Sequence, residues 1–132
     1  INSKKELLDA NIIMKDRILD SHMKNGVAFL DRNIYVEEGV VIHKDTVIYP
    51  NSYILGKTHV GEGVVVGPNS FIRDSILHNG VVIESFAFIE GAEIEDGARI
   101  GPFARIRPKT LIRKGAKVDN CVEIKNTVYG RK

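Results

Sequence analysis

The chain contains very little cysteine and no long apolar run, and both absences limit what it can be. Among its 132 residues Cys121 is the single cysteine, which excludes an internal disulfide and any paired-cysteine zinc site. We expect its side chain to face the core as a small apolar group. No apolar stretch approaches the ~20 residues of a membrane-spanning helix, and the N-terminus lacks the residue order of a signal peptide. These features predict a cytoplasmic protein with no membrane partner.

An excess of charge of one sign is also missing. Nineteen Lys and Arg against seventeen Asp and Glu leave a formal charge of +2, and the two signs are mixed along most of the chain. Because nucleic-acid-binding proteins usually carry a basic patch or stripe, this composition predicts no nucleic-acid partner. The length suffices for one domain's core and not for two full catalytic domains.

The first part of the chain has a helical pattern. Residues 3–6 have the form of a capping box, and Asn25-Gly26 is a stop signal, so we expect a helix over residues 3 to about 24. Two lines of apolar residues at three- and four-residue spacing predict that this helix packs against another body. The first line is Leu7, Ala10, Met14 and Ile18, and the second is Leu8, Ile12 and Leu19.

From Leu30 onward a six-residue period of branched aliphatic residues replaces the helical one. Two five-residue steps interrupt this period, which covers seventeen positions. Leu, Ile and Val make up 38 of the 132 residues, so chance would fill only about five of the seventeen. The positions are Leu30, Val36, Ile42, Ile48, Ile54, Val60, Val66, Ile72, Leu77, Ile83, Ile89, Ile94, Ile100, Ile106, Ile112, Val118 and Ile124.

A six-residue unit suits a short strand followed by a corner. Three units make a triangular coil, and stacked coils pair as parallel strands ~4.8 Å apart. The sequence therefore predicts a mainly β fold, a parallel β-helix of about five to six coils preceded by one α-helix. Small or β-branched residues four positions after the aliphatics mark a second inward position. They include Thr46, Ser52, Thr58, Ser70, Ala87, Ala98, Ala104, Thr110 and Ala116.

Several local stretches are more specific than the repeat. They are residues 1–4, 22–27, 45–50 and 67–70, then Gly-Pro-Phe-Ala-Arg-Ile-Arg-Pro at 101–108 and Asn-Cys-Val-Glu-Ile-Lys at 120–125. With these stretches the chain resembles the left-handed β-helix acyltransferases, and among them the bacterial bifunctional N-acetylglucosamine-1-phosphate uridyltransferase and glucosamine-1-phosphate acetyltransferase family. The repeat leaves the handedness of the coil open, whereas the resemblance implies a left-handed one.

The resemblance also implies a domain organisation and partners. Residues 1–26 would be the end of the uridyltransferase domain with its linker helix, and residues 27–132 the N-terminal part of the acetyltransferase domain. The family is a homotrimer, uses acetyl-coenzyme A as acetyl donor and holds Mg²⁺ in its uridyltransferase site. Its general-base histidine and acetyl-coenzyme A groove would follow Lys132. The chain therefore reads as a fragment that contains no catalytic residue and is inactive alone.

Arg107 and Lys125 are the candidate binding residues. They lie eighteen residues apart, each one step after an inward aliphatic, so they should occupy one outward column on successive coils. A phosphate ester between two such cations would accept charge-assisted hydrogen bonds from both. The alternative is an exposed ion ladder in which Glu90, one coil earlier, pairs with Arg107. The resemblance favours the phosphate site, because the family's matching arginine and lysine help bind the sugar phosphate.

Other candidate residues are matched less completely. Asn2 corresponds to the family's asparagine for Mg²⁺ and the uridine-diphosphate sugar, but the other magnesium ligands are absent. Lys109 and Asp119 stand where the family commonly has glycine, and Cys121 where it has an aromatic, which puts the corner geometry in question. We expect all four histidines, His22, His43, His59 and His78, to face solvent. We also expect one positive face on the last coils, made of Arg105, Arg107, Lys109, Arg113, Lys114 and Lys117.

The leading functional hypothesis is part of an enzyme that makes UDP-N-acetylglucosamine. The resemblance implies acetyl transfer from acetyl-coenzyme A to glucosamine 1-phosphate, followed by uridylyl transfer from UTP. One alternative is another hexapeptide-repeat sugar acyltransferase or nucleotidyltransferase. A second is a noncatalytic β-helix that serves only as a trimerisation scaffold.

Overall fold

The computed structural model describes residues 3–131 and begins with one long helix, α1 (Lys4–Lys24). Ser3 is its N-cap, as the capping-box pattern predicts, because the Ser3 hydroxyl accepts a hydrogen bond from the Glu6 backbone N–H at 3.1 Å. The helix ends at Lys24, with Asn25 as its C-cap. No helix among these described residues has the length and apolar character needed to cross a membrane.

Short parallel strands follow, and over residues 3–131 they form three sheets of six strands each. The first sheet contains β1 (Ala28–Phe29), β4 (Val47–Ile48), β7 (Val65–Val66), β10 (Val82–Ile83), β13 (Arg99–Ile100) and β16 (Lys117–Val118). The second contains β2 (Tyr35–Val36), β5 (Tyr53–Leu55), β8 (Phe71–Arg73), β11 (Phe88–Glu90), β14 (Arg105–Ile106) and β17 (Glu123–Ile124). The third contains β3 (Val41–Ile42), β6 (His59–Val60), β9 (Ile76–Leu77), β12 (Ala92–Ile94), β15 (Thr110–Ile112) and β18 (Val128–Tyr129).

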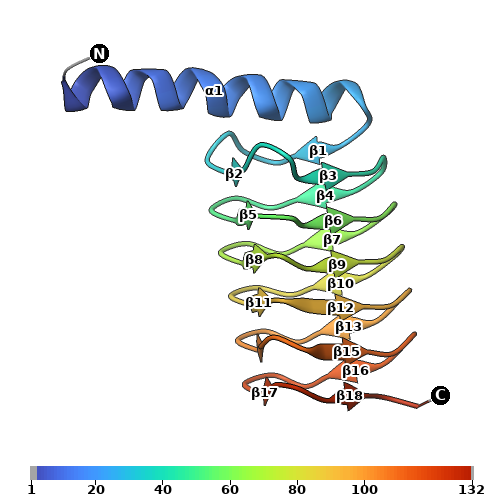
Figure 1. Ribbon diagram of the computed structural model, residues 1–132. Helices are drawn as coiled ribbons and strands as arrows, with labels where there is room; N and C mark the ends of the chain where they lie inside the picture. Colours follow the sequence, from blue (N-terminus) through green and yellow to red (C-terminus); the bar gives the residue numbers. More distant parts are fainter. Residues whose placement is uncertain (1–2, 132) are drawn as a thin grey trace.

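Each strand pairs with the strand three places along the chain, so three consecutive strands make one coil and the three sheets are the faces of a prism. Figure 1 shows the coils stacked in chain order, with α1 lying across the N-terminal end of the stack. The predicted architecture is confirmed: the fold is a parallel β-helix of about six coils preceded by one helix.

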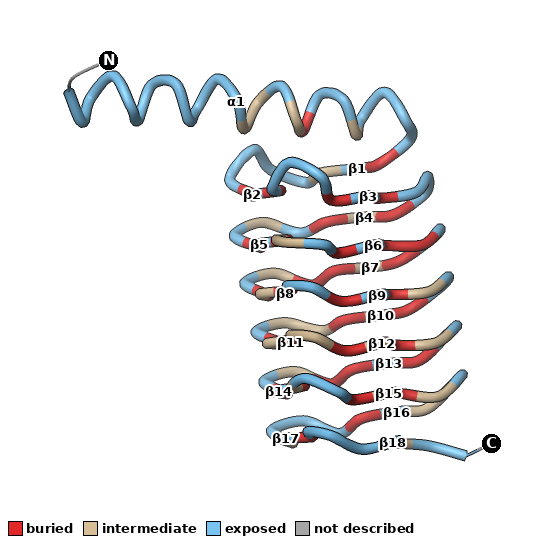
Figure 2. The backbone as a smooth tube through the Cα atoms, in the orientation of Figure 1, coloured by how far each residue is buried: buried red, intermediate tan, exposed pale blue. Residues whose placement is uncertain are grey.

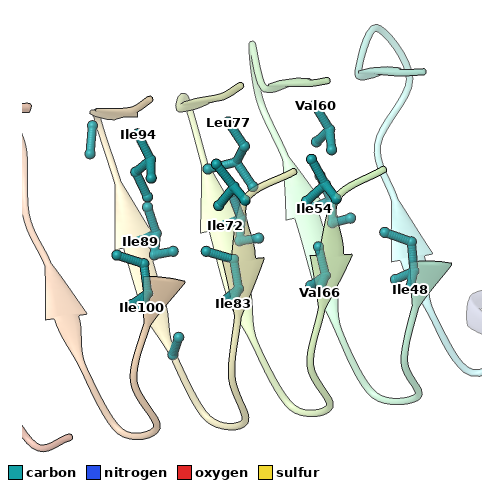
Figure 3. Packing of buried hydrophobic residues seen from close by; sticks show 14 of the residues in the cluster. Ile48, Ile54, Val60, Val66, Ile72, Leu77, Ile83, Ile89, Ile94 and Ile100 are labelled. Carbon is teal, nitrogen blue, oxygen red and sulfur yellow. The ribbon is translucent and has the colours of Figure 1, made fainter. Parts of the chain in front are cut away.

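The core is a set of aliphatic columns inside the prism, and Figure 3 shows the inward residues of successive coils stacked on one another. Of the seventeen predicted positions, all except Leu30 are buried, most of them completely. The small residues of the second inward position are buried too, apart from the partly buried Ala116. The five-residue steps shorten a corner without disturbing the register, since Leu77 pairs with both Val60 and Ile94.

Leu30 is a wrong prediction, because its side chain is 52% exposed. Phe29 takes the inward place and pairs with Ile48. The connection from β1 to β2 contains one residue more than the connection from β4 to β5. The Asp31 carboxylate accepts a hydrogen bond from the Asn33 backbone N–H at 2.7 Å. This hydrogen bond closes the turn that accommodates the additional residue.

The apolar stripe of α1 is covered over only part of its length. Leu19 is buried against the first coil and Ile18 is partly buried, whereas the apolar residues nearer the N-terminus remain exposed. Figure 2 shows this change from exposed to buried along the helix. The exposed residues are Leu7, Leu8, Ile12, Ile13 and Met14. The prediction that the helix packs against another part of the structure is therefore confirmed for its C-terminal half, which packs against the first coil.

Candidate functional site

Arg107 and Lys125 lie on neighbouring coils, immediately after strands β14 and β17. These strands pair in parallel with Ile106 opposite Ile124, and the Arg107 backbone N–H donates to the Ile124 carbonyl oxygen at 2.7 Å. Since a β-helix keeps its register from coil to coil, the two cationic side chains occupy one outward column of the second sheet. Both are accessible to solvent, and the Arg107 side chain is 38% exposed.

A carboxylate stands beside this pair. Glu123 Oε2 lies 3.5 Å from Arg107 Nη1 and 3.9 Å from Arg105 Nη1. Three cations and one carboxylate leave this part of the second sheet with a positive charge. Because ion pairs between exposed side chains contribute at most about 1 kcal/mol, an anionic ligand would compete readily with Glu123 for Arg107.

The ion ladder considered from the sequence is not formed as expected. Glu90 bonds to Arg73, on the coil before it, with Arg73 Nε donating to Glu90 Oε2 at 3.0 Å. This hydrogen bond raises the pKa of Arg73. Arg107 instead has its carboxylate partner on the following coil. Glu123 was missed in reading the sequence, although its place eighteen residues after Arg105 was a usable signal.

The expected single positive face of the last coils is a wrong prediction. Its six residues follow the chain around one coil, and a coil has three faces. Arg105 belongs to β14 of the second sheet, Arg113 follows β15 of the third, and Lys117 belongs to β16 of the first. The positive charge beside Arg107 and Lys125 therefore comes from the second sheet alone, and the rest forms a ring around the prism.

The corners tolerate the departures from the family pattern. Lys109 and Cys121 adopt left-handed backbone conformations, with φ of 63° and 60°. Non-glycine residues enter this region at a modest cost, which the hydrogen bonds of the corners offset. The Cys121 backbone N–H, for example, donates to the Pro102 carbonyl oxygen at 3.0 Å. At this corner the Cys121 side chain is exposed, so the prediction that it faces the core is wrong.

The residues present do not fit a magnesium site. Asn2, the candidate ligand, lies outside the described residues. From residue 3 to residue 131, no three or more His, Cys, Asp or Glu side chains are grouped so that they could hold a metal ion. Mg²⁺ requires carboxylate or phosphate oxygens beside several waters, and this part of the chain offers no such set.

The four histidines lie away from Arg107 and Lys125. His43, His59 and His78 line one hollow on the third sheet, and His78 Nε2 lies 2.7 Å from Glu93 Oε2. His22, at the end of α1, packs edge-on against Phe29, and burial lowers the pKa of its imidazole. The expectation of solvent-facing histidines therefore holds for His43 and His59, which are exposed, and in part for His78, whose side chain is 41% exposed. It is wrong for the partly buried His22.

Coils of three short strands, inward aliphatic columns and a helix at one end define the class of hexapeptide-repeat, left-handed β-helix proteins. A solved structure of the same fold is the acetyltransferase domain of PglB from Neisseria gonorrhoeae FA1090, in complex with acetyl coenzyme A. It superposes with a TM-score of 0.70 at 18% sequence identity, over 89% of this chain and 62% of that one.

Within this class the chain belongs to the family described as the GMPPB C-terminal domain, whose model matches residues 33–129. Curated relatives named "Bifunctional protein GlmU" confirm the resemblance seen in the sequence. The protein from Clostridium novyi (strain NT) is 40% identical over 98% of this chain, and that from Geobacillus sp. (strain WCH70) is 40% identical over 99%. The chain spans 28% of the length of each of these relatives.

Proposed function

We propose that the chain is part of a bifunctional enzyme of UDP-N-acetylglucosamine biosynthesis and supplies the first coils of its acetyltransferase domain. The proposed reactions are N-acetylation of glucosamine 1-phosphate by acetyl-coenzyme A and uridylyl transfer from UTP to the product. The support is 40% identity to proteins named bifunctional protein GlmU over nearly the whole chain, and an acetyltransferase domain of the same fold.

The observation that carries the proposal is the stacking of Arg107 and Lys125 on neighbouring coils. The planar guanidinium of Arg107 would donate two parallel hydrogen bonds to phosphate oxygens, and the ammonium of Lys125 would add a point charge one strand spacing away. Together they would bind the phosphate of the sugar and so fix the distance of its amine from the coils. Glu123 would move away from Arg107 as the phosphate arrives.

The role proposed for these residues is binding and orientation. In acetyl transfer the sugar amine attacks the thioester carbonyl, the carbon–sulfur bond breaks, and a base removes the proton from the amine nitrogen. None of these steps needs a proton from Arg107 or Lys125. We place the base and the acetyl-coenzyme A groove outside these residues, so the 132-residue chain alone should be inactive.

The same proposal covers the domain organisation and assembly. Residues 1–26 would be the end of a uridyltransferase domain with its linker helix, and residues 27–132 the start of the acetyltransferase domain in a cytoplasmic homotrimer. The exposed apolar residues of α1, such as Leu8 and Ile13, support a further body beside the helix. The stacked rings of Phe86 and Phe103, 5.0 Å apart on one corner, offer an apolar contact between prisms.

An acetyl-transfer assay tests the function. The full encoded protein would be incubated with acetyl-coenzyme A and either glucosamine 1-phosphate or glucosamine, and the released thiol measured. We expect turnover with the phosphorylated sugar and a kcat/KM at least about tenfold lower without the phosphate, because charge-assisted hydrogen bonds contribute about 1.5–3 kcal/mol. Absence of acetylation, or equal turnover of both sugars, would refute the proposal.

A second candidate is another hexapeptide-repeat sugar acyltransferase or nucleotidyltransferase, and the match to the GMPPB C-terminal domain model supports it. The same assay separates the two candidates if it includes nucleotidyl transfer. Sugar-nucleotide formation from a hexose 1-phosphate other than N-acetylglucosamine 1-phosphate, without acetyl transfer, would favour the second candidate. Absence of both activities would favour a scaffold.

A further inference from the structure

A histidine pair lies on the third sheet, away from the proposed phosphate site. His43 directly follows β3 and His59 begins β6, and these neighbouring strands pair with Val41 opposite His59. The two imidazole rings tilt toward each other, and their Nε2 atoms share a hydrogen bond at 2.9 Å. Both side chains are exposed, so the pair is open to ions from solution.

A glycine makes the space around this pair. Gly61 occupies the same outward column as His43 on the next coil, because each residue directly follows an inward aliphatic. The His43 backbone N–H donates to the Val60 carbonyl oxygen, and the Gly61 backbone N–H donates to the Leu77 carbonyl oxygen. Without a side chain at Gly61, a hollow of about 300 Å³ remains, lined by His43, His59 and His78 among others. A Cβ at Gly61 would come within 2.5–2.9 Å of Asn79 and His78 atoms and would force a shift.

The hydrogen bond shows that the two Nε2 atoms can meet at one ion, which would replace the proton they share. Imidazole nitrogens bind first-row metal ions at ~2.0–2.1 Å, so nitrogens near their present separation of 2.9 Å would subtend about 90° at that ion. Right-angled nitrogen ligands are those of tetragonal Cu²⁺ and Ni²⁺, and the affinity of nitrogen ligands for divalent first-row ions is highest at Cu²⁺.

We propose that His43 and His59 form a surface site for a tetragonal transition-metal ion, Cu²⁺ or Ni²⁺, with water completing its coordination. Residues 3–131 hold no larger cluster of metal-binding side chains, so the site has two protein ligands. His78 is not one of them, because its Nε2 lies 2.7 Å from Glu93 Oε2. The bound ion links the first two coils and stabilises the N-terminal end of the stack.

Titration with NiCl₂ and CuCl₂ tests the site on tag-free protein. Calorimetry gives the stoichiometry and affinity, electron paramagnetic resonance of the Cu²⁺ form reports nitrogen ligands, and thermal unfolding reports stabilisation. We compare the wild type with His59→Gln and with the matched control His78→Gln, which lines the same hollow outside the pair. Circular dichroism checks that both variants are folded.

We expect one ion per chain, a tetragonal nitrogen-bound Cu²⁺ spectrum and a raised Tm. His59→Gln should weaken binding at least about tenfold and abolish the rise in Tm, because removal of a direct ligand costs at least as much as loss of a supporting contact. His78→Gln should stay within about twofold of the wild type. Absence of stoichiometric binding, an unaffected His59→Gln variant, or equal losses in both variants would overturn the proposal.

Discussion

At the residue scale, two threonines show how a side chain at the second inward position can join neighbouring coils. Thr46 is completely buried, and its hydroxyl donates to the Gly61 carbonyl oxygen at 2.8 Å and accepts from the Val64 N–H at 3.1 Å. Thr110 is 3% exposed, and its Oγ1 has no hydrogen-bond partner among the residues that the structure describes. The same residue type therefore joins coils at one place and only fills space at the other.

Replacing each threonine by valine separates the two situations. Thr46→Val should lower the free energy of unfolding by about 1–3 kcal/mol, because a buried N–H and a carbonyl lose their partner. Thr110→Val should leave it unchanged or raise it by up to about 1 kcal/mol, because a buried hydroxyl without a partner is removed. Urea unfolding of both variants measures the difference. Equal destabilisation by the two substitutions would contradict this interpretation.

At the element scale, Leu19 is the buried side chain through which α1 covers the first coil. Leu19 is 1% exposed, whereas Leu8 on the same helix is 57% exposed. Leu19→Ala should lower the free energy of unfolding by about 2–5 kcal/mol through the cavity it leaves, and Leu8→Ala by less than about 1 kcal/mol. Chemical unfolding curves of the two variants give the comparison. A similar cost for both would show that α1 does not cover the core as described.

The end of α1 also gives the protein a pH response. Burial lowers the pKa of His22 below its ordinary value near 6.5. As the pH falls through that value, the His22 imidazole is protonated in the unfolded chain before it is protonated in the folded chain. The free energy of unfolding therefore decreases below about pH 6.5. Unfolding midpoints measured between pH 8 and pH 5 should decline less in His22→Gln than in the wild type. Parallel pH profiles would rule out this contribution.

Elements were predictable from the sequence where burial alone decides the residue type. The interior of the prism is the apolar environment that residues such as Ile48 and Ile89 require. The six-residue period therefore predicts the burial of sixteen of the seventeen aliphatic positions correctly. The period fails for Leu30, because one additional residue in the corner between β1 and β2 shifts the register. Hydrophobic spacing carries no information about the geometry of that turn. For Arg107 the coil spacing places one carboxylate on the preceding coil and one on the following coil, and it does not decide between them. The long, exposed Arg107 side chain can pair with Glu90 or with Glu123, and the two ion pairs differ only slightly in free energy.

At the scale of the whole molecule, the phosphate site is proposed to work within a trimer. The prisms would stand side by side, so that residues of neighbouring subunits complete each acetyltransferase site. Sedimentation equilibrium of the full encoded protein should give three times its subunit mass at micromolar concentration. A monomer at concentrations where acetyl transfer is full would contradict the proposed assembly.

Direct titration of glucosamine 1-phosphate is the sharpest test of the Arg107–Lys125 site. Calorimetry would compare the wild-type full encoded protein with Arg107→Ala and Lys125→Ala. The matched control is Arg99→Ala, since Arg99 is also exposed and paired with a carboxylate, Glu84, but lies on the first sheet. We expect each site substitution to weaken binding about 10–100-fold and the control to change it less than about twofold. Unchanged affinity in both site variants would contradict the phosphate site.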